Sequence, residues 1–84
     1  MQSNDVPRAL WEIAREIRKD WKNVSYAAKP YLEAMESLCS IYERYGSDNA
    51  KGIVLYFLSN AGSWRGETAK RIKAELKQML KTAK

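Results

Sequence analysis

The chain has 84 residues, of which 15 are Lys or Arg and 10 are Asp or Glu, and its formal net charge is +5. One cysteine and no histidine exclude an internal disulfide and remove the side chain on which most zinc and acid–base sites depend. With hydrophobic residues at 45% and charged residues at 30%, we expect one globular helical domain over residues 1–84. The N-terminal residues lack the apolar run of a signal peptide, so the expected location is the cytoplasm.

Positive charge is concentrated at the C-terminal end of the sequence. Residues 64–84 hold seven basic residues against two acidic ones, an excess of +5 that equals the net charge of the whole chain. A basic segment of this kind favours an acidic partner, either a nucleic acid or an acidic protein surface.

The first predicted element is a helix over residues 5–22, after a frayed end at residues 1–4. Asp5 is the predicted N-cap, and Pro7 falls in the first turn, where a missing backbone N–H is tolerated. At about 100° per residue, the apolar side chains share one stripe, which predicts an amphipathic helix. This stripe consists of Val6, Leu10, Ile13, Ala14, Ile17 and Trp21.

A second helix is predicted over residues 25–45, with Ser25 as its N-cap. Pro30 removes a backbone donor and disfavours the helical conformation at Lys29, so the first turn is either separate or kinked. Gly46 is expected to end this helix in a left-handed conformation. The apolar stripe that we expect on its buried side consists of Tyr31, Met35, Leu38, Tyr42 and Tyr45.

Residues 53–58, IVLYFL, form the only charge-free apolar run, and periodicity alone allows either a strand or a helix. Because no second strand is predicted to pair with it, we expect a helix over residues 48–61, capped by Ser47 or Asp48 and buried nearly all round. Gly62 closes this predicted helix. The run is far shorter than the ~20 residues that span a bilayer, so no membrane is expected as a partner.

The last predicted helix covers residues 64–82, with Ser63 as its N-cap. Its apolar stripe consists of Ala69, Ile72, Leu76, Met79, Leu80 and Ala83. Short connections between the four helices predict an all-α fold, a compact four-helix bundle in which the third helix is the most buried.

No catalytic or metal-binding arrangement is visible in the sequence. Glu33 and Glu36 share a helix face, but it is the polar one, and carboxylate metal sites in bundles need inward-facing Glu-x-x-His partners. A helix-turn-helix with its turn at Gly62 would bury Arg71 without a partner, and a turn at Gly66 would bury Glu75. We therefore expect a protein that is not an enzyme, has no cofactor or metal, and does not read the major groove.

Two basic helix faces are the stronger signal. We expect both to contact the phosphates of a nucleic acid, with Trp11 stacking on a base. The alternative is that Trp11 covers a neighbouring helix under arginine stems, while the lysines only keep the domain in solution. Convergence of the two faces favours nucleic acid, whereas an exposed apolar patch on the second helix favours a protein partner. The first face consists of Arg8, Trp11, Arg15, Arg18 and Lys22, and the second of Lys70, Lys73, Lys77, Lys81 and Lys84.

Two segments, SYAAKPYLEAMESL at residues 25–38 and IVLYFLSNAGSWRGETAKRIKAELKQML at 53–80, carry a resemblance. They resemble small uncharacterised helical proteins of conjugative and phage-like mobile elements in Gram-positive gut bacteria. The resemblance implies no activity and no site residue, only a setting in which accessory, regulatory and inhibitor proteins are common. We expect a small accessory protein that binds nucleic acid weakly through its basic helix faces, or alternatively a protein-interaction module, either adaptor or inhibitor.

Overall fold

The computed structural model describes residues 8–82 of the chain. Within them the elements follow the order α1, α2, β1, β2, α3 and α4, so the fold is mostly helical and carries a small antiparallel hairpin. The expectation of a purely all-α chain is therefore wrong at this hairpin. The bounds are Leu10–Asp20 for α1, Lys29–Met35 for α2, Arg44–Tyr45 for β1, Asp48–Asn49 for β2, Ala50–Ser59 for α3 and Glu67–Thr82 for α4.

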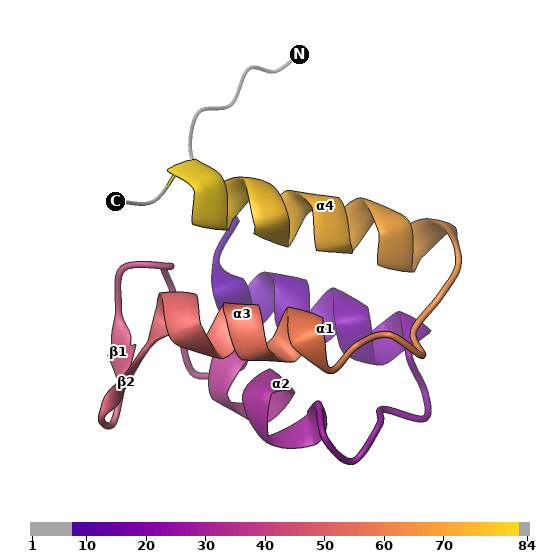
Figure 1. Cartoon of the computed structure of the whole chain (residues 1–84), viewed down its shortest axis with the longest axis horizontal. Helices are drawn as coiled ribbons and strands as arrows, with labels where there is room; N and C mark the ends of the chain where they lie inside the picture. The colour runs from indigo at the N-terminus through magenta and orange to yellow at the C-terminus, as the bar shows by residue number, and fades with distance from the viewer. Residues whose placement is uncertain (1–7, 83–84) are drawn as a thin grey trace.

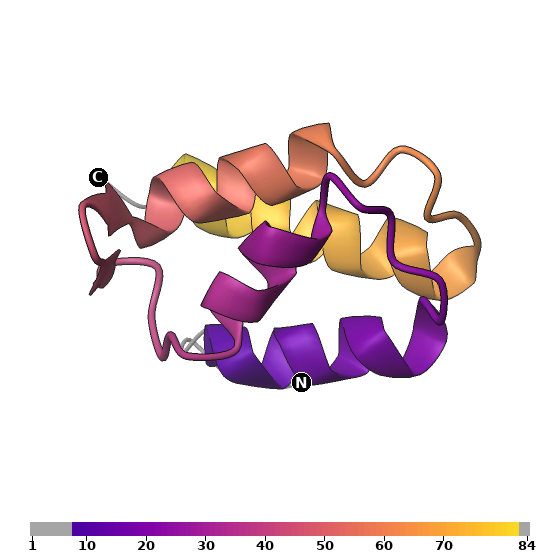
Figure 2. The ribbon, with the colours of Figure 1, turned by 90° about the horizontal axis from the view of Figure 1, so that it is seen from below.

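Helices α1 and α3 form the middle of the molecule, and α2 and α4 lie on opposite sides of them (Figures 1 and 2). Both α2 and α4 contact α1 as well as α3. This arrangement lets the buried apolar side chains of all four helices face one interior.

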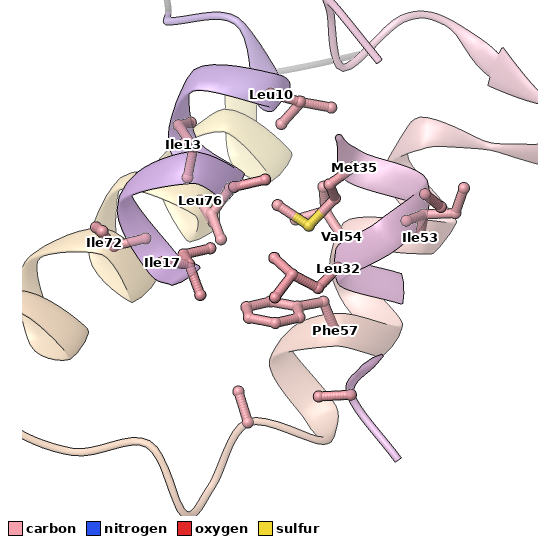
Figure 3. Packing of buried hydrophobic residues seen from close by; sticks show 14 of the residues in the cluster. Leu10, Ile13, Ile17, Leu32, Met35, Ile53, Val54, Phe57, Ile72 and Leu76 are labelled. Carbon is pink, nitrogen blue, oxygen red and sulfur yellow. The ribbon is translucent and has the colours of Figure 1, made fainter. Parts of the chain in front are cut away.

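Phe57 of α3 occupies the centre of that interior, where side chains from all four helices point toward one another (Figure 3). The indole rings of Trp21 and Trp64 stack with centroids 5.6 Å apart, and the Phe57 ring meets both of them edge-on. The prediction that Ile53, Val54, Phe57 and Leu58 pack against the other helices is confirmed. The first three share one cluster with Leu10, Ile17, Leu38, Ile72 and Leu76, and Leu58 packs against it.

The described part of α1 is shorter than its predicted range at both ends. The helix begins at Leu10, where the Glu12 carboxylate accepts a 3.0 Å hydrogen bond from the Ala9 backbone N–H. It ends at Asp20, so that Trp21 turns into the core and Lys22 lies in the bend beyond the helix. The predicted cap at Asp5, the stripe residue Val6 and the frayed end at residues 1–4 lie outside the described residues.

The predicted second helix over 25–45 is wrong in most of its length, because α2 covers only Lys29–Met35. A separate turn precedes it, Pro30 sits in its first turn, and the Ser25 hydroxyl donates to the Asn60 carbonyl instead of capping the helix. After α2 the chain passes the start of α1, whose N–H groups at Leu10 and Trp11 need acceptors. They donate to the carbonyls of Cys39 and Leu38, at 3.3 Å and 3.0 Å respectively.

The hairpin β1–β2 explains the remaining errors in this region. Tyr42 and Tyr45, predicted for the buried stripe, are exposed, whereas Met35 and Leu38 are buried as expected. Gly46 does adopt a left-handed conformation, with φ of 63°, but it does so in the hairpin turn rather than at a helix end.

The apolar run is helical, yet it is not buried all round. Helix α3 begins at Ala50, and the Asn49 carboxamide oxygen accepts the N–H of Gly52 at 2.8 Å, so neither Ser47 nor Asp48 is the cap. Leu55 and Tyr56 are 54% and 53% exposed, which contradicts the expected burial of the third helix on all sides.

Helix α4 begins at Glu67, three residues later than predicted, because residues 61–66 form a loop whose Gly66 has a φ of 113°. Ser63 is therefore not the N-cap, and Trp64 turns into the core. Helix α3 likewise ends at Ser59, before Gly62. The predicted apolar stripe of α4 is confirmed at four buried residues, Ala69, Ile72, Leu76 and Met79. Leu80 is partly buried, and Ala83 lies outside the described residues.

Candidate nucleic-acid interface

An ion-pair network joins α1 to α4 along one edge of their contact. The Arg8 guanidinium donates to Glu75 at 2.6 Å and 2.9 Å and to Glu16 at 2.9 Å, and Arg71 of α4 pairs with the same Glu16. Arg71 and Arg8 lower the pKa of Glu16, and hydrogen bonds to Glu75 and Glu16 raise the pKa of Arg8 against the effect of its burial. Arg8, a predicted phosphate contact, is therefore already bonded to two carboxylates of the protein itself.

The other predicted residues of the first basic face lie on the side of α1 toward α2. Arg18 pairs with Glu36, just beyond the end of α2. Trp11 is 38% exposed, and the Arg15 guanidinium lies over its ring at 5.4 Å from the centroid. This cation–π contact matches one part of the alternative interpretation, the arginine over the tryptophan ring. Lys22 is exposed beyond the helix end.

Helix α4 presents a more open set of cations. Lys70, Lys77 and Lys81 are exposed, and none of them pairs with an acidic residue within 8–82. Lys73 is half-buried, because its ammonium group donates to the Trp64 carbonyl at 2.7 Å and lies 5.8 Å from the Trp64 ring centroid. Lys84 lies outside the described residues. We call Lys70, Lys73, Lys77 and Lys81 the lysine flank.

The two predicted basic faces do not converge. Arg71 and Glu75, which bond to α1 and to Arg8, lie on one side of the buried stripe of α4, and the lysine flank lies on the other side. The side of α1 that meets α4 likewise carries acidic groups, Glu16 and Asp20, and Asp20 accepts the Trp64 indole N–H at 2.8 Å. The two faces therefore lack the convergence that, by the criterion given above, favours nucleic acid over a protein partner.

One basic residue of this region was missed among the candidate site residues. Arg65 precedes α4 and lines an open hollow of about 530 Å³ together with Lys70, Lys73 and Glu67. The loop brings Arg65 back toward Lys73, and burial, followed by the charges of Lys77 and Arg65, lowers the pKa of Lys73. The sequence signal was the pair of glycines that bracket Ser63-Trp64-Arg65, which shows a loop but not the direction of its side chains.

Other kinds of site have little support in the described part of the chain. Among residues 8–82, no group of His, Cys, Asp and Glu side chains is placed to hold a metal ion. None of the helices described there has the length and apolarity needed to cross a membrane. Cys39 is a free, exposed thiol. The chemistry that this surface offers is the binding of anions by exposed cations.

The chain matches no protein-family model, no curated protein and no solved structure. Its function is therefore inferred from the charge and geometry of its surface.

Proposed function

We propose that this protein is a small non-enzymatic accessory protein that binds nucleic acid weakly, through phosphate contacts from the lysine flank of α4. The supporting observation is the contrast in how the cations are used. Arg8, Arg18 and Arg71 are held in ion pairs, while Lys70, Lys77 and Lys81 stand exposed without an acidic partner among residues 8–82.

The proposed interface is narrower than the two-faced surface expected from the sequence. Lys70 and Lys81 are eleven residues apart on α4 and therefore about 16 Å apart along its axis, the length of about five phosphates on one strand of a duplex. Trp11 lies on α1 beneath the Arg15 guanidinium, so the narrower interface does not include it. Contacts to phosphates alone carry no sequence information, so the binding has no strict sequence preference.

Salt dependence tests this proposal most directly. The affinity for a short duplex, measured by fluorescence anisotropy from low to moderate salt, is expected to fall with a log–log slope of about −0.9 per phosphate neutralised. Replacing Lys70, Lys77 and Lys81 together by Gln should make the slope shallower by about 2 to 3, because three such contacts are lost. Gln keeps a good helix propensity at these exposed positions.

A matched control separates a defined surface from net charge alone. Replacing Arg15, Lys19 and Lys22 by Gln removes the same three charges from exposed positions elsewhere. This control should leave the slope close to that of the unchanged protein. Equal slopes for both triple variants, or no binding at about 100 µM protein in low salt, would contradict the proposal.

A second candidate function, a protein-interaction module, is favoured by exposed aromatic residues on the α2 and α3 side. Tyr26, just before α2, is 93% exposed, and the rings of Tyr31 and Tyr56 contact each other with centroids 5.5 Å apart. Aromatic side chains of this kind are enriched at protein interfaces. The test is capture from the source cells with nuclease treatment, where a bound protein should survive nuclease and be lost with Tyr26→Ser and Tyr56→Ser.

A further inference from the structure

Two open hollows lie along the lysine flank. The one at the start of α4 is lined by Arg65, Lys70, Lys73 and Glu67, and the other, of about 500 Å³, is lined by residues of α4 alone, with Lys77 and Lys81 among them. Lys77 and Lys81 lie further along the helix and do not line the first hollow, whereas Arg65 approaches it from the preceding loop. Cations from two elements thus surround one concave volume of about 530 Å³. A group that enters the first hollow can be contacted from the loop and from α4, whereas a group beside Lys77 and Lys81 meets cations of α4 alone.

The charge in the first hollow is not balanced by the protein. Three basic side chains and one carboxylate line it, which leaves two positive charges in excess. No ion pair within residues 8–82 involves Arg65, Lys70 or Lys73. The lowered pKa of Lys73, caused by burial and by the charges of Lys77 and Arg65, agrees with crowding of like charges.

We propose that this hollow binds a phosphate monoester at the end of a nucleic-acid strand. A terminal phosphate carries a charge of about −1.5 to −2 at neutral pH and three acceptor oxygens, which matches the excess of two positive charges. A backbone diester carries a single charge and is flanked by nucleotides on both sides, so it fits a hollow less well. The inference rests on the proposed function, since it assigns the strand end to the same basic surface.

Trp64 forms a buried wall of the hollow rather than a stacking platform. Its ring stacks on Trp21 in the core, and the Lys73 ammonium group lies beside it. A phosphate bound between Arg65 and Lys73 would draw the Lys73 ammonium group away from the Trp64 carbonyl to which it now donates. The emission of Trp64 should therefore respond to a ligand in the hollow, and less to a ligand bound along Lys77 and Lys81.

The decisive experiment compares two single strands with a 3′ dye and equal total charge. One carries a 5′-phosphate, and the other has a 5′-hydroxyl and about two more nucleotides, so that long-range attraction is matched. Anisotropy titrations should show about tenfold tighter binding of the phosphorylated strand, the effect of one or two hydrogen bonds to a charged group. Arg65→Gln, or Lys70→Gln as a second variant, should reduce this preference to about twofold or less, whereas Lys81→Gln should weaken both strands equally.

Two results would overturn the inference. Equal affinity for the two strands, with the salt slope of the lysine flank intact, would remove the strand-end site and leave the proposed function standing. Inorganic phosphate that changes Trp64 emission as strongly, and at the same concentration, as the phosphorylated strand would assign the hollow to free phosphate. If the hydroxyl strand fails to bind while the phosphorylated strand binds, the strand-end site is supported and binding along the lysine flank is not.

Discussion

Phe57 shows how much of the stability of this small domain depends on a single side chain. It is fully buried, and its ring meets Trp21 and Trp64 edge-on, at centroid distances of 6.2 Å and 6.5 Å. Its neighbour Tyr56 has a similar size but faces outward. Adjacent positions on one helix thus differ completely in what they contribute to the core.

Phe57→Ala is expected to lower the free energy of unfolding by about 3 to 5 kcal/mol, because it leaves a cavity under both tryptophan rings. That loss approaches the total stability of a domain of this size. Urea unfolding monitored by circular dichroism measures the effect. Tyr56→Ala serves as the control and should cost much less; equal losses for the two variants would contradict the structure.

At the scale of the elements, the contact between α1 and α4 combines buried apolar stripes with the network of Arg8, Glu16, Arg71 and Glu75 at its edge. The network is partly exposed, so its contribution to stability is screened by solvent and salt. Glu16 nonetheless makes stability depend on pH, because its pKa is lowered in the folded protein by hydrogen bonds and charges from Arg71 and Arg8.

A lowered pKa in the folded state means that the contribution of Glu16 is complete above its usual value of 4.5 and is lost as the pH falls through the folded value. Glu16→Gln should therefore destabilise the protein at pH 7 and lose less further stability than the unchanged protein on acidification below about pH 4.5. Thermal unfolding between pH 7 and pH 2 provides the measurement.

Glu33→Gln is the matched control for this pH dependence, because Glu33 is exposed and makes no ion pair within residues 8–82. It should keep the acid-dependent loss of the unchanged protein. If the Glu16 and Glu33 variants follow the same pH profile, the network does not contribute in the way that its geometry indicates.

At the scale of the whole molecule, the core is one continuous cluster to which all four helices contribute. Neither α2, with seven residues, nor α3, with ten, is long enough to be stable alone in water. Each helix therefore depends on the others for burial of its apolar stripe. We expect the described elements to fold and unfold together.

Cooperative unfolding gives the corresponding prediction. In a Trp11→Phe background, tryptophan emission reports on Trp21 and Trp64 in the core, while far-ultraviolet circular dichroism reports on all helices. The two signals should change at the same urea concentration, as expected for a two-state domain of this size. A core signal that is lost before the helical signal would indicate that the aromatic cluster is not shared by the whole fold.

Local sequence patterns were sufficient to predict the structure of segments whose conformation depends on their own residues. The apolar stripes of α1 and α4 repeat at the period of a helix over several turns, so their buried residues could be predicted from the sequence. The helical state of the 53–58 run also followed from the sequence, since no strand partner was predicted for it. Gly46 was assigned a left-handed conformation as a helix cap, and the conformation is correct although the residue lies in the hairpin turn, because glycine adopts a positive φ at little cost in either setting.

The candidate site could be predicted only in part. Charge content alone placed the net excess of +5 in residues 64–84, and helical spacing placed the lysine flank on one side of α4. Spacing could not show that Arg8 and Arg18 meet carboxylates, because Glu75 and Glu36 are distant from them in the sequence. It likewise could not show that Arg65 turns toward Lys73, because a loop has no period.

The sequence by itself determined a mostly helical domain with one apolar core and a basic C-terminal helix, because hydrophobic period and charge are local properties of the chain. Only the tertiary structure decided where α2 ends. Its predicted continuation is replaced by a segment whose Leu38 and Cys39 carbonyls accept the first N–H groups of α1. The N–H groups of α1 need these carbonyls as acceptors only once α1 has packed beside this segment. No pattern within residues 25–45 could therefore indicate where α2 ends. The divergence of the two basic faces was likewise decided by the tertiary structure, because packing determines which side of each helix meets its neighbours.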